Sequence, residues 1–144
     1  MAAPPFNVVA NRLGVNRETG AILTDWDHCV QSIWDILTTE VGSRVMLLDY
    51  GASPADLLDR PGNQQVIALW YSSIVTAIYR WEPGFRIARF ILESAGPDGH
   101  YTFDIIGLFY PRGHLGDYSL VEDRTVSFLT NVQDNTFAVV GLVA

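Results

Sequence analysis

Two stretches in the first half of the chain repeat apolar residues with the period of an α-helix. The first begins near Thr24 or Asp25, either of which could cap a helix, and Gly42 would stop it just past its last turn. Within it, residues at three- and four-residue spacing form one apolar face. These residues are Trp26, Cys29, Val30, Ile33, Ile36 and Leu37. The pattern predicts an amphipathic helix.

The second helical stretch covers about Gln64 to Trp81 and carries its own apolar stripe. Its members are Ile67, Trp70, Ile74, Ala77, Ile78 and Trp81. Glu82-Pro83-Gly84 should end this helix, because proline disfavours helix in the residue before it and glycine breaks the helix after it. Four aromatic residues crowd the stretch and cannot all face one core, which favours a protein interface for some of them. They are Trp70, Tyr71, Tyr79 and Trp81.

The rest of the first half is expected to be short or irregular. Residues 1–20 contain several prolines and glycines and are predicted to form an irregular arm. Arg44 to Tyr50 is predicted to be extended. A short helix should follow, with Ser53 as its cap and Pro54 in its first position.

The second half of the chain has the pattern of β-strands joined by turns. Phe85–Ala95 and Tyr101–Tyr110 flank the sequence GPDGH, a strong hairpin signal. Tyr101–Tyr110 is apolar on both faces for part of its length, as expected of an inner strand that is covered on two sides. Val121–Val132 and Thr136–Val143 then form a second hairpin.

Helices first and strands later predict an α+β fold, with N-terminal helices packed on a small, mainly antiparallel C-terminal sheet. The chain has no internal repeat, low-complexity tract or linker. We therefore expect a single domain over residues 21–144, preceded by the irregular arm of residues 1–20.

The charge of the chain excludes several classes of function. Sixteen acidic residues outnumber nine basic ones, all of the latter are arginine, and the net charge is −7. Without a basic run the chain is a poor candidate for binding nucleic acid. Without lysine it can perform neither Schiff-base nor P-loop chemistry. No apolar run is long enough to cross a bilayer, and no secretory signal is visible, so we expect a soluble protein in a reducing compartment and no membrane partner.

The sequence offers little sign of a catalytic, cofactor or metal site. The three histidines are far apart, and no His/Cys pair has the spacing of metal ligands. The single cysteine, Cys29, lies on the apolar helix face and is interpreted as a buried thiol. Paired carboxylates could serve a glycosidase, although an acidic chain offers many chance pairs. The candidates are Asp25, Asp27, Asp35, Asp49, Glu82 and Asp104.

A run of local motifs carries a family resemblance. GVNRETG (14–20) precedes LTDWDHCVQSIWDILTTEVGSRVMLLDYGA (23–52), and DLLDRPGN (56–63) and RWEPGFRI (80–87) follow. In this order the motifs resemble the phage baseplate assembly protein W-like family of contractile tails, which includes wedge proteins once labelled tail lysozymes. The resemblance covers roughly Gly14 to Gly107.

The resemblance implies a structural, non-enzymatic role for one baseplate wedge domain. Members of the family occupy the inner baseplate wedge around the tube, in a sixfold assembly. They bind other wedge subunits and present a surface on which the tail sheath starts to polymerise, with the tail tube or hub as further neighbours. The expected location is the tail baseplate of a virion assembled in the host cytoplasm. The alternatives are a lysozyme-like peptidoglycan hydrolase and the homologous subunit of a tailocin or secretion system.

Two positions depart from the family pattern. The family commonly has Glu-Pro-Arg after the long helix, with the arginine contacting wedge partners, whereas this chain has Glu82-Pro83-Gly84. Arg86 is the candidate to replace the missing arginine. The resemblance and the helix-end charges together predict a partner-binding set of Glu82, Pro83, Arg86, Arg80 and Trp81.

The second departure is Leu47-Leu48, where relatives usually have basic residues. Because neighbouring residues of an extended segment point to opposite faces, at least one leucine should be buried or at an interface.

At the other end of the chain, residues 136–144 carry no charge. Open strand edges accept strands from other chains, and monomers usually block them with lysine, proline or bulges. This region, or the strand before it, is therefore expected to receive the sheath; the alternative is that residues 136–144 form a buried final strand.

Overall fold

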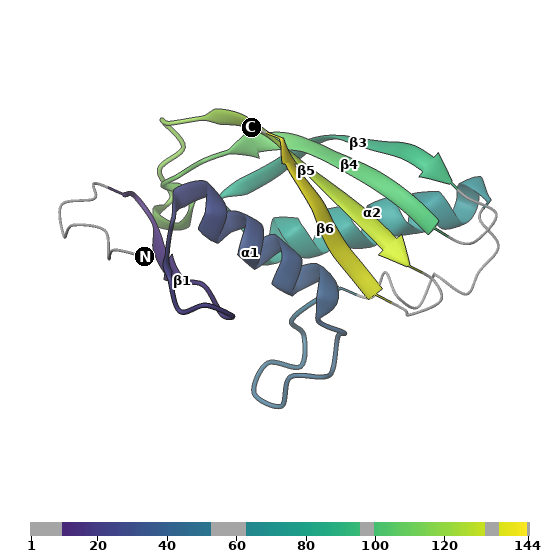
Figure 1. Ribbon diagram of the computed structural model, residues 1–144, viewed down its shortest axis with the longest axis horizontal. Helices are drawn as coiled ribbons and strands as arrows, with labels where there is room; N and C mark the ends of the chain where they lie inside the picture. The colour runs from purple at the N-terminus through teal and green to yellow at the C-terminus, as the bar shows by residue number, and fades with distance from the viewer. Residues whose placement is uncertain (1–9, 53–62, 96–99, 132–135, 144) are drawn as a thin grey trace.

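The computed structural model describes residues 10–52, 63–95, 100–131 and 136–143 of the chain (Figure 1). A short hairpin, β1 (Leu13–Val15) and β2 (Ile22–Thr24), leads directly into helix α1 (Asp25–Thr38). Helix α2 (Gln64–Trp81) follows. The remaining elements are β3 (Phe85–Ala95), β4 (His100–Phe109), the 3-10 turn η2 (Gly113–Leu115), β5 (Glu122–Asn131) and β6 (Thr136–Val143).

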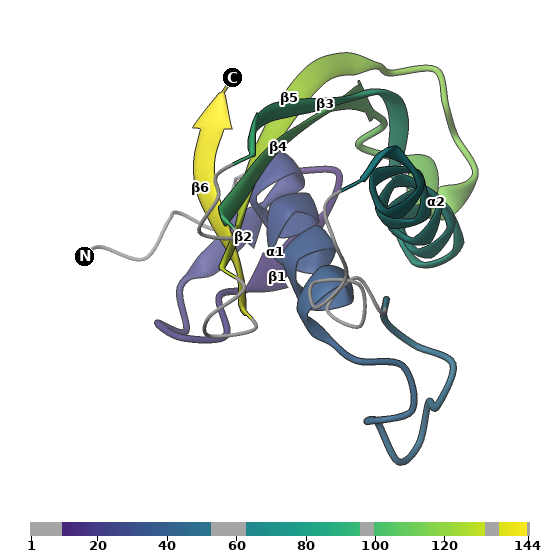
Figure 2. The same ribbon diagram turned by 90° about the vertical axis from the view of Figure 1, so that its right-hand side faces the viewer.

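The main sheet has four strands in the order β3-β4-β5-β6, and each neighbouring pair is antiparallel. Helices α1 and α2 both lie on the concave side of this curved sheet (Figure 2). The core between helices and sheet is built by Ile33, Ile36, Ile74, Ile78, Phe85, Ile105, Phe109 and Val126. The predicted α+β fold, with helices packed on an antiparallel sheet, is confirmed.

Both long helices occur where the apolar periodicity predicts them. The buried residues of α1 are the six predicted from the sequence. In α2 the stripe is shifted slightly, because Val66 is buried while Ile67 and Trp81 are only partly covered. Asn63 caps α2 by accepting a hydrogen bond from the backbone N–H of Val66 at 2.9 Å. Of the helix's aromatic residues, Trp70 is buried and Tyr79 is exposed, so they do not share one core.

The four predicted strands of the second half are also present, but one of their predicted features is wrong. Strand β4 is an inner strand, and its residues Phe103, Ile105 and Phe109 are buried against the helices. Its other face, including Ile106 and Leu108, is only half-buried. Both described long helices pack on the same side of the sheet, so no helix among the described residues covers the other face of β4.

Two further expectations for the first half need correction. The expected irregular arm contains β1, which pairs with β2 from Leu13↔Thr24 to Val15↔Ile22. Arg44–Tyr50 is not extended but consists of tight turns, in which the N–H groups of Leu47 and Tyr50 bond to carbonyls three residues earlier. The predicted helix after Ser53 and the turns at 96–99 and 132–135 lie outside the described residues.

Candidate interaction site at the end of helix α2

A buried ion pair fixes the chain where α2 ends. Glu82 is the C-cap residue of α2, and its backbone N–H donates to the carbonyl of Ile78 at 2.8 Å. Its side chain is 1% exposed, and its two carboxylate oxygens accept hydrogen bonds of 2.5 and 2.8 Å from the guanidinium of Arg12. Oε1 also accepts from the N–H of Gly84 at 3.2 Å. The carboxylate therefore joins the helix end, the following turn and the N-terminal segment.

Arg12 reaches Glu82 because the start of α1 holds the backbone around it. The Asp25 carboxylate accepts from the N–H groups of Asn11 and Arg12, each at 2.9 Å, and the Asp25 N–H donates to the Arg12 carbonyl at 2.9 Å. Asp25 adopts a positive φ of 37°, which is uncommon for a residue with a side chain. Of the two expected caps, Thr24 occupies the N-cap position of α1, and the three bonds of Asp25 position Arg12 instead.

The ion pair shapes the electrostatics of the groups around it. Burial alone would lower the pKa of Arg12, but the hydrogen bond and charge of Glu82 outweigh it and raise that pKa. Burial, followed by the negative charge of Glu82, raises the pKa of Cys29 well above its usual value. Cys29 is fully buried, which confirms its interpretation as a buried thiol. Burial and the charge of Arg12 lower the pKa of His28.

The surroundings of Gly84 leave little room for a side chain at this position. A Cβ atom on Gly84 would lie 3.0 Å from Glu82 Oε1 and 3.3 Å from both Arg12 Nη1 and the Tyr110 carbonyl. The guanidinium of Arg12 therefore occupies the space beside position 84. Sequence reasoning missed Arg12, because 70 residues separate it from Glu82 and no local spacing connects the two.

Next to the ion pair lies a small cavity of about 210 Å³, lined by Tyr79, Glu82, Pro83, Phe85, Arg86 and Tyr118. Pro83 and Arg86 are exposed at its edge. The Arg86 guanidinium lies 4.8 Å from the ring centroid of Tyr118, which is the distance of a cation–π contact. Three members of the predicted partner-binding set thus border one cavity: Glu82 from inside, Pro83 and Arg86 from outside.

The other two predicted residues, Arg80 and Trp81, face a different neighbour. Arg80 pairs with Asp49 at 3.2 Å, and its guanidinium lies 4.7 Å from the Trp81 ring centroid. The Trp81 ring in turn lies 5.2 Å from that of Tyr50. Both residues therefore contact the segment between the helices, and they do not line the cavity beside Glu82.

Neither metal ligands nor a membrane span emerge from the residues that the structure describes. Within 10–52, 63–95, 100–131 and 136–143, no three His, Cys, Asp or Glu side chains come together as metal ligands would. Across the same residues, neither helix has the length and apolar character needed to cross a membrane.

Comparisons with known proteins give the family. The model of the family described as baseplate wedge protein gp25 matches residues 25–110. Baseplate protein W of Escherichia phage P2 is 36% identical over 100 residues, which cover 69% of this chain and 86% of that protein.

Two solved structures have the same fold. A chain in the cryo-EM structure of the postcontracted pyocin R2 baseplate has a TM-score of 0.61 at 30% identity, over 68% of this chain and 98% of that one. A crystal structure of a putative tail lysozyme from Geobacter sulfurreducens has a TM-score of 0.53 over 71% and 87% of the two chains. Because its identity is 23%, it supports the fold alone. The chain belongs to the baseplate wedge protein gp25 family and is a structural component of a contractile tail baseplate.

Proposed function

We propose that this wedge protein is non-enzymatic, docks on other wedge subunits through the end of α2, and starts sheath assembly at its free sheet edge. The observation that carries the proposal is the contrast between the two edges of the main sheet. Strand β6 is at one edge and β3 is at the other.

The β6 edge lacks the charged residues and prolines that normally hinder strand addition, although its register with β5 shifts once, where Val140 is the extra residue. Among the described strands β6 pairs only with β5, from Thr125↔Val143 to Asn131↔Thr136. No charged residue or proline occurs in β6. Its other side therefore offers backbone N–H and C=O groups to a strand from another chain.

The β3 edge is protected in the usual ways. It carries Arg86, Arg89 and Glu93, and its register with β4 shifts twice, between Ile87 and Arg89 and between Leu92 and Ser94. Charges and bulges both discourage pairing with a further strand. Of the two edges, β6 is thus the one suited to receive an arm of the sheath protein.

Docking on other wedge subunits is assigned to the predicted set at the end of α2. Pro83 and Arg86 present an exposed surface beside the 210 Å³ cavity, and Arg80 and Trp81 extend it toward the segment between the helices. Glu82 contributes indirectly, because its buried pair with Arg12 holds the turn that carries Pro83 and Arg86. Arg86 takes the place of the family arginine at the partner surface.

Four of the six candidate carboxylates are held by other groups of the chain, which supports a structural role over a lysozyme-like one. A glycosidase needs two carboxyl groups that flank a sugar and are free to exchange protons with it. Asp25 is bonded to two backbone N–H groups, Asp49 to Arg80, and Glu82 to Arg12. Asp35 is bonded to Arg17, Arg44 and Tyr50. Incubation of the pure protein with cell walls should therefore release no peptidoglycan fragments, and turnover that is lost on changing one carboxylate would overturn this part.

The sheath assignment is tested by adding charge to each edge in turn. We expect Ala138→Lys with Val140→Lys on β6 to leave the protein in the baseplate but to reduce the fraction of tails with sheath, as counted by electron microscopy. Ala88→Lys with Ser94→Lys adds the same charge to exposed positions of β3 and should leave sheathed tails unchanged. Thermal unfolding checks that both variants fold, and Thr136→Lys provides a milder change on β6. Normal sheaths on folded β6 variants would refute the assignment.

A further inference from the structure

Residues 39–52, which follow α1, form a loop that projects from the body of the protein (Figure 1). Its tip is strongly apolar. Met46 is 95% exposed and Val45 is 87% exposed, and Leu47 and Leu48 are also exposed. Neither leucine is buried, and the segment is not extended, so the alternation from which burial of one leucine was expected is absent. Such a contiguous apolar patch on a soluble protein typically marks an interaction site.

The backbone of this loop is closed at its base and braced across its middle. The Ala52 N–H donates to the Thr39 carbonyl at 3.1 Å, and the Gly42 N–H donates to the Leu48 carbonyl at 2.8 Å. Gly51 has a φ of +112°, and a Cβ atom there would lie 2.1 Å from the Thr39 oxygen, so only glycine fits the closure. The segment is therefore a structured Ω-loop, a type of loop that is often functional.

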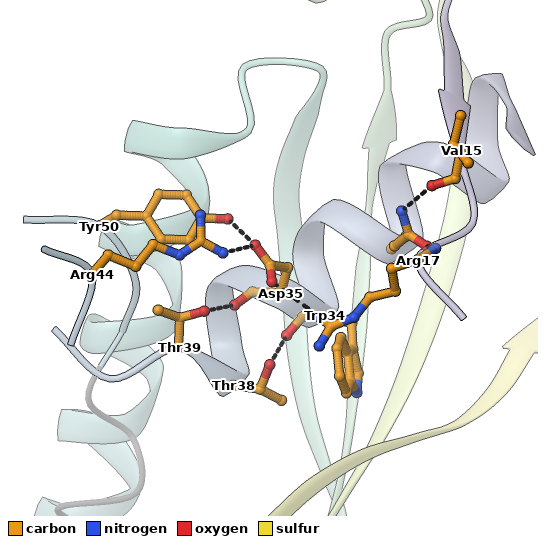
Figure 3. A network of polar contacts seen from close by, with 9 residues as sticks. Val15, Arg17, Trp34, Asp35, Thr38, Thr39, Arg44 and Tyr50 are labelled. Carbon is orange, nitrogen blue, oxygen red and sulfur yellow. Dashed lines mark hydrogen bonds and ion pairs between the residues drawn. The ribbon is translucent and has the colours of Figure 1, made fainter. Parts of the chain in front are cut away.

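A polar network anchors the loop to α1 (Figure 3). The Asp35 carboxylate accepts from Arg44 at 2.5 Å, from the Tyr50 hydroxyl at 2.8 Å and from Arg17 at 3.1 Å. The Arg44 guanidinium lies 4.0 Å from the Tyr50 ring centroid. On the other side, Asp49 pairs with Arg80 of α2. The polar side chains thus hold the base of the loop, and the apolar side chains are left at its tip.

We propose that loop 39–52 is a docking element that inserts Met46 and its neighbours into an apolar groove, rimmed by basic side chains, on another baseplate protein. The inference extends the proposed docking function to a second surface and depends on it. An ordered loop that holds apolar side chains in water forgoes about 25 cal/mol for each Å² that burial would remove from solvent. A groove on a neighbouring subunit recovers that free energy, and the prior order of the loop reduces the entropy lost on binding.

Charge identifies the kind of groove. Glu40 and Asp49 are both exposed on the loop, on either side of the apolar tip, and the Asp49 side chain remains 73% exposed although it pairs with Arg80. The loop's one cation, Arg44, is already paired with Asp35. A groove with arginine or lysine at its rim is complementary to this arrangement. An anionic membrane surface would repel the two acids instead.

A second copy of this chain is a poor partner for the loop. Its candidate groove is an open, largely apolar cavity of about 340 Å³ beside Leu23, Val30 and Trp34. Asp27 and Glu18 also line this cavity, and they would face Glu40 and Asp49 of an incoming loop. The cavity's one arginine, Arg17, is already paired with Asp35.

Photo-crosslinking in the assembled particle tests the partner directly. We replace Met46 with the photoreactive residue p-benzoylphenylalanine and irradiate purified tails, with the same residue at exposed Thr19 as the matched control. The expected product is a covalent adduct between position 46 and a different baseplate protein, identified by mass spectrometry. An adduct with a second copy of this chain or with lipid, or no adduct at all, would overturn the proposal.

A second test measures incorporation into the baseplate. Met46→Asp with Leu48→Asp changes only exposed side chains, so the purified variant should melt like the parent while its incorporation falls by about tenfold or more. Leu115→Asp, at another exposed apolar position, is the control and should be incorporated to a greater extent. Normal incorporation of the loop variant would refute the loop proposal. If the loop variant were incorporated normally and the β6 variants still reduced sheath assembly, the loop proposal would fail and the proposed sheath function would stand.

Discussion

Two carboxylates, Glu82 and Asp35, each join segments that are far apart in the sequence, but their surroundings differ. The Glu82 side chain is 1% exposed and has one arginine, Arg12, bound through both oxygens. The Asp35 side chain is 26% exposed and accepts from Arg17, Arg44 and Tyr50. Glu82 thus lies at the end of a core helix, whereas Asp35 lies under a projecting loop.

This difference indicates that the contacts of Glu82 support the whole fold, whereas those of Asp35 support a surface loop. A buried ion pair has given up its hydration, so removal of one partner leaves a charge with nothing to compensate it. A partly exposed pair keeps water as a substitute partner and contributes little to stability. We therefore expect changes at Glu82 and Arg12 to affect folding of the whole chain, and changes at Asp35 to affect mainly loop 39–52.

The largest expected effect comes from Arg12→Met. This change keeps the length and apolar stem of the side chain but leaves the buried Glu82 carboxylate without its arginine. We expect the free energy of unfolding to fall by about 3 kcal/mol or more. Urea unfolding followed by tryptophan fluorescence measures the loss.

Two variants separate the loss of charge balance from the loss of packing. Arg12→Met combined with Glu82→Gln removes both charges and keeps an oxygen for the Gly84 N–H, so it should recover part of the lost stability. Arg89→Met, at an exposed position of β3, should change stability by less than about 0.5 kcal/mol. If Arg12→Met were as mild as Arg89→Met, the view that this pair fixes the end of α2 would be wrong.

A smaller and more local effect is expected from Asp35→Asn. The asparagine keeps the shape of the side chain but removes the charge that holds Arg44 and Arg17. Because the pairs are partly exposed, we expect a loss of only about 1 kcal/mol in global stability. Hydrogen exchange should instead rise sharply at the Gly42 and Tyr50 amides, whose bonds lie within the loop.

Salt provides the control for this comparison. The Debye length falls from about 10 Å at 0.1 M to about 3 Å at 1 M, which weakens exposed pairs far more than buried ones. The difference between Asp35→Asn and the parent should therefore shrink at 1 M NaCl, while that between Arg12→Met and the parent should persist. Equal salt dependence at the two sites would remove the distinction drawn between them.

The sequence predicted the parts of the fold that depend on local periodicity. The apolar spacing located α1 and α2, and the alternation and turn residues located the four strands of the main sheet. It failed for Arg44–Tyr50, because the apolar run there resembles a strand although its residues form turns in solvent. An exposed apolar segment and a buried strand have the same composition, and only packing distinguishes them.

The candidate site was predictable only in part, and for a similar reason. The end of α2 at Glu82-Pro83-Gly84 follows from local backbone preferences. The partner of Glu82 does not, since the bond to Arg12 depends on how Asp25 holds the backbone at the start of α1. Contacts between distant segments arise from tertiary packing, and no spacing rule in one sequence encodes them.

The smallest expected effect is on the pH dependence of stability, and it comes from His28, whose pKa is affected by the buried pair of Arg12 and Glu82. Burial, and then the positive charge of Arg12, lower the pKa of His28 in the folded protein, an effect opposed by the charge of Glu82. The unfolded chain therefore takes up a proton on this histidine first as the pH falls below about 6.5. Stability that is present above pH 6.5 should be lost as the pH falls toward the lower folded pKa.

His28→Gln tests this sign, because glutamine cannot take up that proton. Urea unfolding of the parent and the variant at a series of pH values from 7.5 to about 5 should show a parent curve that falls more steeply, starting near pH 6.5. His100→Gln, which removes a histidine at the far end of β4, is the matched control for the loss of a histidine elsewhere in the fold. A parent that gained stability relative to His28→Gln on acidification would show that Glu82, rather than burial and Arg12, dominates the electrostatics of His28.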